Sequence, residues 1–239
     1  MWNSTQRGGG LVPGGIQYHD LHSSGLVSDL LNFHMLNVWG GVDISLSQHL
    51  KRETAAAHRH LESQLGLVDP GLDLHGYRLV LETFYGFYVP VETDVARLAA
   101  AQLPLEFPLR TRAELIGRDL LARGLTPSQL TALPQCDDRA EMSCFEDFAG
   151  CLYVLEGACL GGQVLASLLH RRLGLTKDTG AAFFAGDEER TLRRWKIIVA
   201  WLDGLSRAGV STARIIGTAQ ATFDAFARWA VFTREDGRG

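Results

Sequence analysis

The sequence predicts an all-helical protein with one main domain. Strand signals are almost absent, because few β-branched residues alternate with polar ones and no hairpin turn is flanked by such runs. From residue 47 onward, apolar residues recur at helical spacing in segments bounded by capping residues, Pro or Gly. The chain has 239 residues, 46% of them hydrophobic and 21% charged, and can bury a substantial core. We therefore expect a single-domain helical bundle over residues 47–232.

The two ends of the chain lack this pattern. Residues 1–46 carry GGG, VPGG and WGG with scattered apolar residues and no sustained period. They also lack the basic start and continuous apolar core of a signal peptide. We predict an irregular or disordered extension at residues 1–46, with Met35 as a candidate natural start, and a flexible tail at residues 233–239.

The first predicted helix covers residues 50–66, LKRETAAAHRHLESQLG, with Ser47 as its N-cap. His58 lies beside its apolar stripe, and Glu62 follows one turn later. A carboxylate at that spacing can accept one ring N–H and leave the other nitrogen for a metal, although a plain surface hydrogen bond has the same pattern. His60 is rotated by ~200° from His58 on an ideal helix, so the two cannot share a metal.

Six further helical patterns follow, one of which contains a glycine-rich segment. The first, residues 73–101, is rich in aromatic residues that we assign mainly to core packing, and Pro90 predicts a kink one turn earlier. The others are expected at residues 111–123, 126–133, 139–173, 187–208 and 211–232.

The glycine-rich segment is residues 153–164, YVLEGACLGGQV, within the predicted helix 139–173. Each glycine inside a helix costs about 1 kcal/mol relative to alanine, so Gly157, Gly161 and Gly162 require a reason. Gly157 and Gly161 are four residues apart and expose a strip of bare backbone on one face. That strip suits either a flat ligand or close packing against another helix.

Taken together, the motifs LKxxTxxxHxxLE and YxLEGxxLGGQV resemble those of the heme oxygenase family, especially bacterial members that supply bilin to phytochromes. The resemblance covers residues 48–232, with the segment FYGFYVPVE at 84–92 between the motifs. It implies that His58 is the proximal ligand of heme iron, positioned by Glu62. It also implies that the glycine segment forms a kinked distal helix, with heme b between the two helices as both cofactor and substrate.

The resemblance implies further site residues, and the sequence departs from the family pattern at one position. Gly157, Gly161 and Gly162 would form the catalytic distal surface. Lys51, Tyr153, Arg194 and Lys196 would anchor the propionates. Arg194 and Lys196 belong to a basic cluster that also holds Arg190 and Arg193, and a solvated surface is the alternative for each of these charges. Many family members carry aspartate after the first distal glycine, where this chain has Ala158. The proton donor therefore stays unassigned, with Glu156 adjacent to the segment.

The composition gives no support for nucleic-acid binding, disulfide bonds or a membrane span. The net charge of −4 and the dispersed arginines give no reason to expect nucleic acid. Cys136, Cys144, Cys151 and Cys159 form no CxxC pair, so free thiols in a reducing compartment are expected. No run of about 18 apolar residues is apparent, so we predict no membrane span.

The resemblance implies a cytoplasmic heme oxygenase that uses O2 and reducing equivalents to convert heme to biliverdin, Fe2+ and CO. Its electron donor would be a ferredoxin or flavodoxin-type protein, and a bilin-binding phytochrome is a candidate partner. Three alternatives stay open: a heme carrier without catalysis, a thiaminase-like hydrolase with a nucleophilic cysteine, and a di-iron oxygenase. The last would need a Glu and His cluster of the ExxH type, which the sequence lacks.

Overall fold

The computed structural model describes residues 45–102, 108–186 and 188–236, and within them every assigned element is a helix. The helices are α2 (Leu46–Leu65), α3 (Leu74–Gln102), α4 (Ala113–Ala122), α5 (Pro127–Thr131), α6 (Phe145–Gly157), α7 (Gly162–Leu173), α8 (Ala182–Ala185), α9 (Glu188–Arg207) and α10 (Thr212–Asp236). The predicted all-α class is confirmed. The predicted extension at residues 1–46 lies almost wholly outside the described residues.

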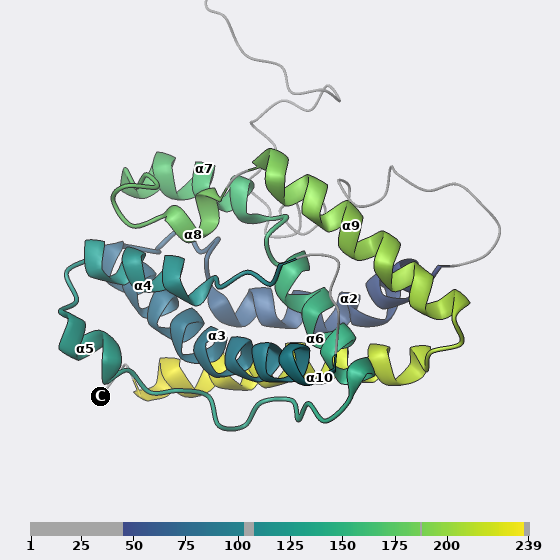
Figure 1. Cartoon of the computed structure of the whole chain (residues 1–239). Coiled ribbons are helices and arrows are strands. Elements are labelled where there is room, and N and C mark those ends of the chain that lie inside the picture. Colours follow the sequence, from purple (N-terminus) through teal and green to yellow (C-terminus); the bar gives the residue numbers. More distant parts are fainter. Residues whose placement is uncertain (1–44, 103–107, 187, 237–239) are drawn as a thin grey trace, which may run out of the picture. The chain divides into compact units, whose positions relative to one another are not determined.

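Helix α10 is the central element of the bundle. It packs against α2, α3 and α6, while α9 crosses α2 and α6 on another side (Figure 1). Helix α8 links two neighbours, because it contacts both α4 and α7. The arrangement brings α2, which carries the candidate histidine, next to α9 and α10, and places α6 against the same two helices.

The start of α2 differs from the prediction. Ser45, not Ser47, is the N-cap, and Ser45 and Gln48 form a reciprocal capping box. Ser47 instead donates its backbone N–H to the Asp203 carboxylate of α9 at 2.9 Å. The sequence contains serine at both positions, and only this long-range contact, to a residue 156 positions away, distinguishes their roles.

Helix α3 runs through Pro90 without interruption. Proline has no N–H to donate to the carbonyl of residue 86, one turn earlier. That carbonyl, on Gly86, instead accepts the backbone N–H of Cys136 at 2.9 Å. A Cβ on Gly86 would lie 2.5 Å from the Pro134 carbonyl oxygen and 2.6 Å from the Trp229 ring, so glycine lets the 134–136 segment approach closely enough to make this bond.

The predicted helix at 139–173 is in fact two helices, α6 and α7, preceded by a non-helical segment. Residues 139–144 are not helical, α6 begins at Phe145, and residues 158–161 form a turn before α7. Each of these departures has a local cause. Asp147 accepts the backbone N–H groups of Ser143 and Cys144, which fixes the start of α6, and the glycines weaken the helix where it breaks.

One apolar stretch bears on the prediction of no membrane span. The stretch Phe145–Leu173 is long and apolar enough, by length and composition alone, to cross a membrane. Nevertheless 44% of its most apolar window is buried inside the protein, and the turn at 158–161 divides it. The core helices of a soluble protein meet the same criterion, so this stretch is weak support for a membrane span.

Removing the charge of Asp147 should destabilise the junction of α6 and α10. Burial raises the pKa of this carboxyl, but the Arg214 guanidinium, the Ser143 N–H and the Thr218 hydroxyl outweigh that effect and hold the pKa well below its usual range. We expect Asp147→Asn to lower the free energy of unfolding by about 2–3 kcal/mol at pH 7, because charged hydrogen bonds are lost.

The lowered pKa of Asp147 determines how its contribution to stability changes with pH. An acid with a lowered folded-state pKa stabilises the protein above its unfolded pKa of about 4, and that contribution disappears as the pH falls further. Urea unfolding at pH 7, 4 and 2 should therefore show a nearly constant gap between wild type and Asp147→Asn down to pH 4 and a smaller gap at pH 2. Asp138→Asn, which breaks the exposed pair with Arg228, is the control and should change stability little. A gap as large at pH 2 as at pH 7 would contradict the assignment.

Candidate functional site

His58 lies on α2 in the geometry that its spacing predicts. Its Nδ1 is 3.5 Å from Oε2 of Glu62, one turn later, and the histidine side chain is 39% exposed. The ring also makes an edge contact with Phe223 of α10, with centroids 5.4 Å apart. A carboxylate and an aromatic ring therefore restrain the imidazole, while Nε2 is the nitrogen left for a ligand. His60 is exposed, as expected for the opposite side of the helix.

Tyr153 joins the histidine helix to α6. The pKa of its phenol is raised to about 12 by burial, against which a hydrogen bond with Thr54 acts. Thr54 is buried on α2, one turn before His58, and its hydroxyl also donates to the Leu50 carbonyl at 2.7 Å. Tyr153 is thus a buried link between two helices, whereas the sequence suggested a propionate anchor at the start of the distal helix.

The glycines of the turn between α6 and α7 have different surroundings. A Cβ on Gly162 would lie 2.5 Å from the Phe184 carbonyl oxygen, so Gly162 permits the close contact of α7 with α8. At Gly157 the nearest atoms belong to the indole of Trp195, 3.6 Å from an ideal Cβ, which is ordinary contact. Gly161 is buried with a right-handed φ of −77°, a conformation open to any residue. Of these three, Gly157 is the one whose bare backbone faces a flat ring.

A stability comparison can separate these two kinds of glycine. Gly162→Ala should lower the free energy of unfolding by about 1–3 kcal/mol, because the Phe184 backbone has to shift. Gly157→Ala should leave stability unchanged or raise it by up to about 1 kcal/mol, since alanine favours the helix and its methyl group fits beside Trp195. Both values can be read from urea denaturation. Equal losses in the two variants would mean that Gly157 also serves backbone packing.

A buried ion pair borders this turn. Glu156, the residue before Gly157, accepts from Nε of Arg194 at 2.7 Å, and Arg194 Nη2 lies 2.5 Å from the same oxygen. Both side chains are less than a tenth exposed, and Arg194 Nη1 also donates to the Pro108 carbonyl at 2.7 Å. The sequence suggested Arg194 as a propionate anchor, but the structure uses its guanidinium to hold α9 against α6.

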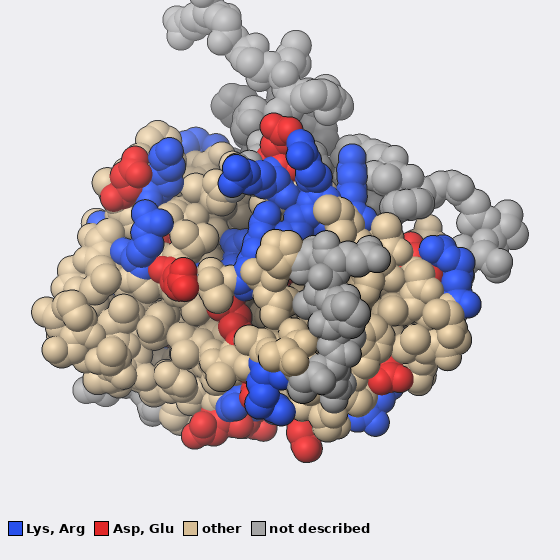
Figure 2. Space-filling view, viewed as in Figure 1, with Lys and Arg blue, Asp and Glu red and all other residues tan. Residues whose placement is uncertain are grey.

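The other basic residues of α9 are exposed. Lys and Arg side chains gather over its first turns (Figure 2), where Arg190, Arg193 and Lys196 all face solvent. Arg193 pairs with Glu189 at 3.0 Å, with both side chains more than 70% exposed. On α2, Lys51 is half-buried, and burial lowers its pKa. Lys51 and Lys196 therefore stay the predicted anchors.

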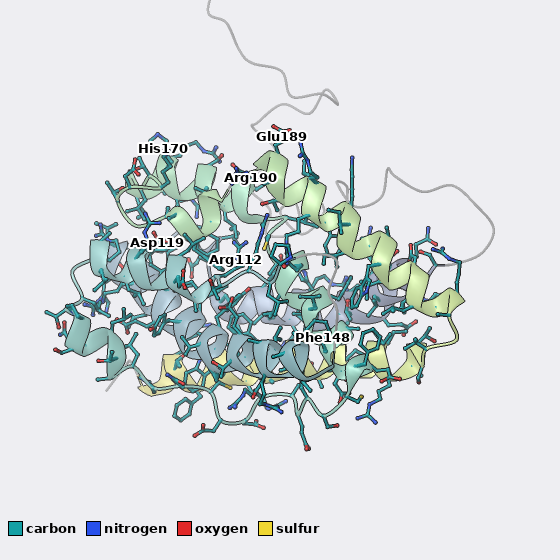
Figure 3. The ribbon with its side chains drawn as sticks, viewed as in Figure 1. Arg112, Asp119, Phe148, His170, Glu189 and Arg190 are labelled. Carbon is teal, nitrogen blue, oxygen red and sulfur yellow. The ribbon has the colours of Figure 1, made fainter. Side chains whose placement is uncertain are left out.

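A second buried arginine contacts the turn itself. Arg112 donates from Nη1 to Sγ of Cys159 at 2.6 Å and from Nη2 to the Phe183 carbonyl at 2.9 Å. Its guanidinium also stacks on the Phe183 ring, 4.7 Å from the centroid. Figure 3 shows Arg112 beneath Arg190, the latter on the first turn of α9. The turn at 158–161 is thus held by Arg112, the N-cap residue of α4, through a contact with no recognisable sequence signal.

Burial disfavours the thiolate form of the cysteines. Burial raises the pKa of Cys151 to about 12 and that of Cys159 to about 11, and it also raises the pKa of Cys144. The thiolate is the reactive form, so these values disfavour the thiaminase-like alternative. Within residues 45–102, 108–186 and 188–236, no group of three or more His, Cys, Asp or Glu side chains is placed to hold a metal ion.

Two cavities of the described region lie away from His58 and from the turn at 158–161. One, of about 410 Å³, is bounded by α7, α8 and the loop between them; the other, of about 260 Å³, lies where α2 ends and α3 begins. Neither is lined by His58 or by the turn at 158–161. Among the residues that the sequence singles out, Tyr153 contacts Thr54, which lies one turn before His58 on α2, and Trp195 lies against both Tyr153 and Gly157.

Comparisons with known proteins agree with this architecture. The family model described as heme oxygenase matches residues 44–231. A solved structure of the heme oxygenase from Neisseria meningitidis, in its NO- and CO-bound forms, matches 81% of this chain and 92% of its own. The two share 24% sequence identity and a TM-score of 0.62, which supports a common fold. No curated protein gives a significant match. The family match spans most of the chain, which therefore belongs to the heme oxygenase family.

Proposed function

We propose that the protein is a heme oxygenase that converts heme to biliverdin, Fe2+ and CO with O2 and reducing equivalents, and that it works in the cytoplasm. The proposal rests mainly on the position of His58. A heme oxygenase needs a neutral histidine at the iron, and the Nδ1 atom of His58 lies beside the Glu62 carboxylate. The residues present fit the group. The donor is half-exposed, and the bare backbone of Gly157 already accepts a flat aromatic ring.

The protein's own residues have separate tasks in this proposal. Glu62 holds the His58 imidazole in one tautomer, and Phe223 limits its rotation. Gly157 keeps side-chain atoms away from the distal face, so that O2 has room there. Lys51 and Lys196 would pair with the propionates. Bound heme supplies the iron at which O2 is reduced, and it is also the substrate that is cleaved.

Proton delivery differs from what the family resemblance implies. Position 158 is alanine, and the neighbouring carboxylate of Glu156 is bound to Arg194. We therefore propose that ordered water, held by backbone groups of the turn at 158–161, carries protons to the distal face. A bacterial ferredoxin or flavodoxin-type protein is the proposed electron donor, and a phytochrome is the proposed acceptor of the bilin.

A spectroscopic experiment tests the proposal. Hemin is added to the purified protein, and the visible spectrum is followed in air after addition of ascorbate or reduced ferredoxin. We expect a Soret band that forms and then decays while a broad bilin absorption grows at longer wavelength. A stable Soret band would favour a heme carrier, the alternative that Ala158 supports. Absence of any Soret band would exclude both.

A further inference from the structure

The starting observation is the position of Trp195 on α9. Its indole lies 3.6 Å from the ideal Cβ position of Gly157 and packs at a tilt against Tyr153, with centroids 5.6 Å apart. Tyr153 in turn contacts Thr54 on the histidine helix. A half-buried aromatic ring therefore covers the bare backbone that the proposed function assigns to the tetrapyrrole.

We propose that Trp195 is a gate on the heme site: its indole covers Gly157 and rotates away when heme enters. This inference rests on the proposed function. Two planar rings cannot occupy one face of Gly157 at the same time, so heme binding there requires the indole to leave.

The ion pair beside Trp195 determines how the indole leaves. Arg194, the preceding residue, is held by Glu156 and by the Pro108 carbonyl, with both charged side chains buried. Moving α9 away from α6 would break these contacts and expose an unpaired charge, which is costly. Rotation of the half-buried Trp195 side chain leaves them intact. The gate is therefore a side chain on a fixed helix.

Trp201 is a matched control on the same helix. It packs against Phe145 and Phe148 of α6, with centroids 5.8 and 6.2 Å away, two turns from Trp195. Figure 3 shows Phe148 low on α6, on the side away from Arg190. Trp201 therefore reports any movement of α9 as a whole, whereas Trp195 reports the gate.

The first test uses the full chain labelled with 5-fluorotryptophan, with the five indole signals assigned from single Trp→Phe variants. Gallium protoporphyrin is the probe, because it is diamagnetic and its binding can be followed by its visible absorption. We expect the fluorine signal of Trp195 to shift strongly on saturation and that of Trp201 to stay. Saturable binding with no shift at Trp195 would overturn the gate while leaving the proposed function intact. A large shift of both signals would overturn the fixed-helix mechanism. No porphyrin binding at all would overturn the proposed function and the gate with it.

The second test is kinetic. Stopped-flow mixing with hemin gives the association rate of wild type, Trp195→Ala and Trp201→Ala. If the site is open about a tenth of the time, removing the gate should raise the association rate up to about tenfold, since apparent affinity scales with the competent fraction. The Trp201→Ala rate should match wild type. An unchanged or slower rate in a folded Trp195→Ala variant, as judged by its helical circular dichroism, would overturn the gate.

Discussion

His58→Ala should abolish the histidine-ligated heme spectrum and reduce biliverdin formation to background, while the helical circular dichroism and the unfolding midpoint stay close to wild type. The reason is that the imidazole is the proposed iron ligand, whereas its side chain is 39% exposed and contributes little to the core. Absorption spectra with hemin and a turnover assay with reduced ferredoxin provide the measurement. Added imidazole should restore part of the spectrum, because it can enter the space left by the side chain.

The same helix provides two controls for His58. His60→Ala removes an exposed histidine that cannot reach the same iron, so its spectrum and turnover should equal those of wild type. Glu62→Gln keeps the size of the carboxylate partner but removes its charge. Loss of such a partner to a metal-bound histidine typically costs 10- to 100-fold in affinity or activity, and we expect a loss in that range. Turnover by His58→Ala at the wild-type rate would remove His58 from the site.

The histidine pair shows what spacing alone can predict. A carboxylate four residues after a histidine on a helix lies close to the ring whatever the rest of the fold does, and the structure places these two groups 3.5 Å apart. Similarly, the aromatic segment at 84–92 reads as core from its apolar content, and Phe84, Phe87 and Tyr88 are buried. Such inferences succeed because they depend on a single element.

Predictions that depend on contacts between two segments were wrong more often. The sequence predicted one helix across residues 139–173, because glycines lower helix stability without showing where a break occurs. It also predicted Arg194 as a propionate anchor among four similar cations. Its partner, Glu156, is 38 residues away, and no periodicity within either segment indicates that these two side chains pair. The role of Trp195 depends on the same contact between α6 and α9.

Removing the carboxylate of Glu156 should destabilise the protein by about 3–5 kcal/mol, because a buried guanidinium then loses its charged partner. The relevant variant is Glu156→Ala, and urea unfolding at pH 7 measures the change. Arg194 is less than a tenth exposed, so water cannot easily replace the lost oxygen. The exposed pair Arg193 and Glu189 lies on the same helix, and Glu189→Ala should have a small effect there because solvent screens it.

A double variant distinguishes the ion pair from simple packing. Glu156→Leu combined with Arg194→Met replaces both charges by apolar side chains, and such exchanges of buried pairs are often neutral. We expect the double variant to recover most of the stability that Glu156→Ala loses, although the Pro108 carbonyl still lacks its donor. If the Glu156–Arg194 pair also holds α9 in the position from which Trp195 covers Gly157, the double variant should bind hemin with wild-type stoichiometry but at a different rate. A double variant as unstable as Glu156→Ala would show that the geometry of the charged pair is itself required where α6 meets α9.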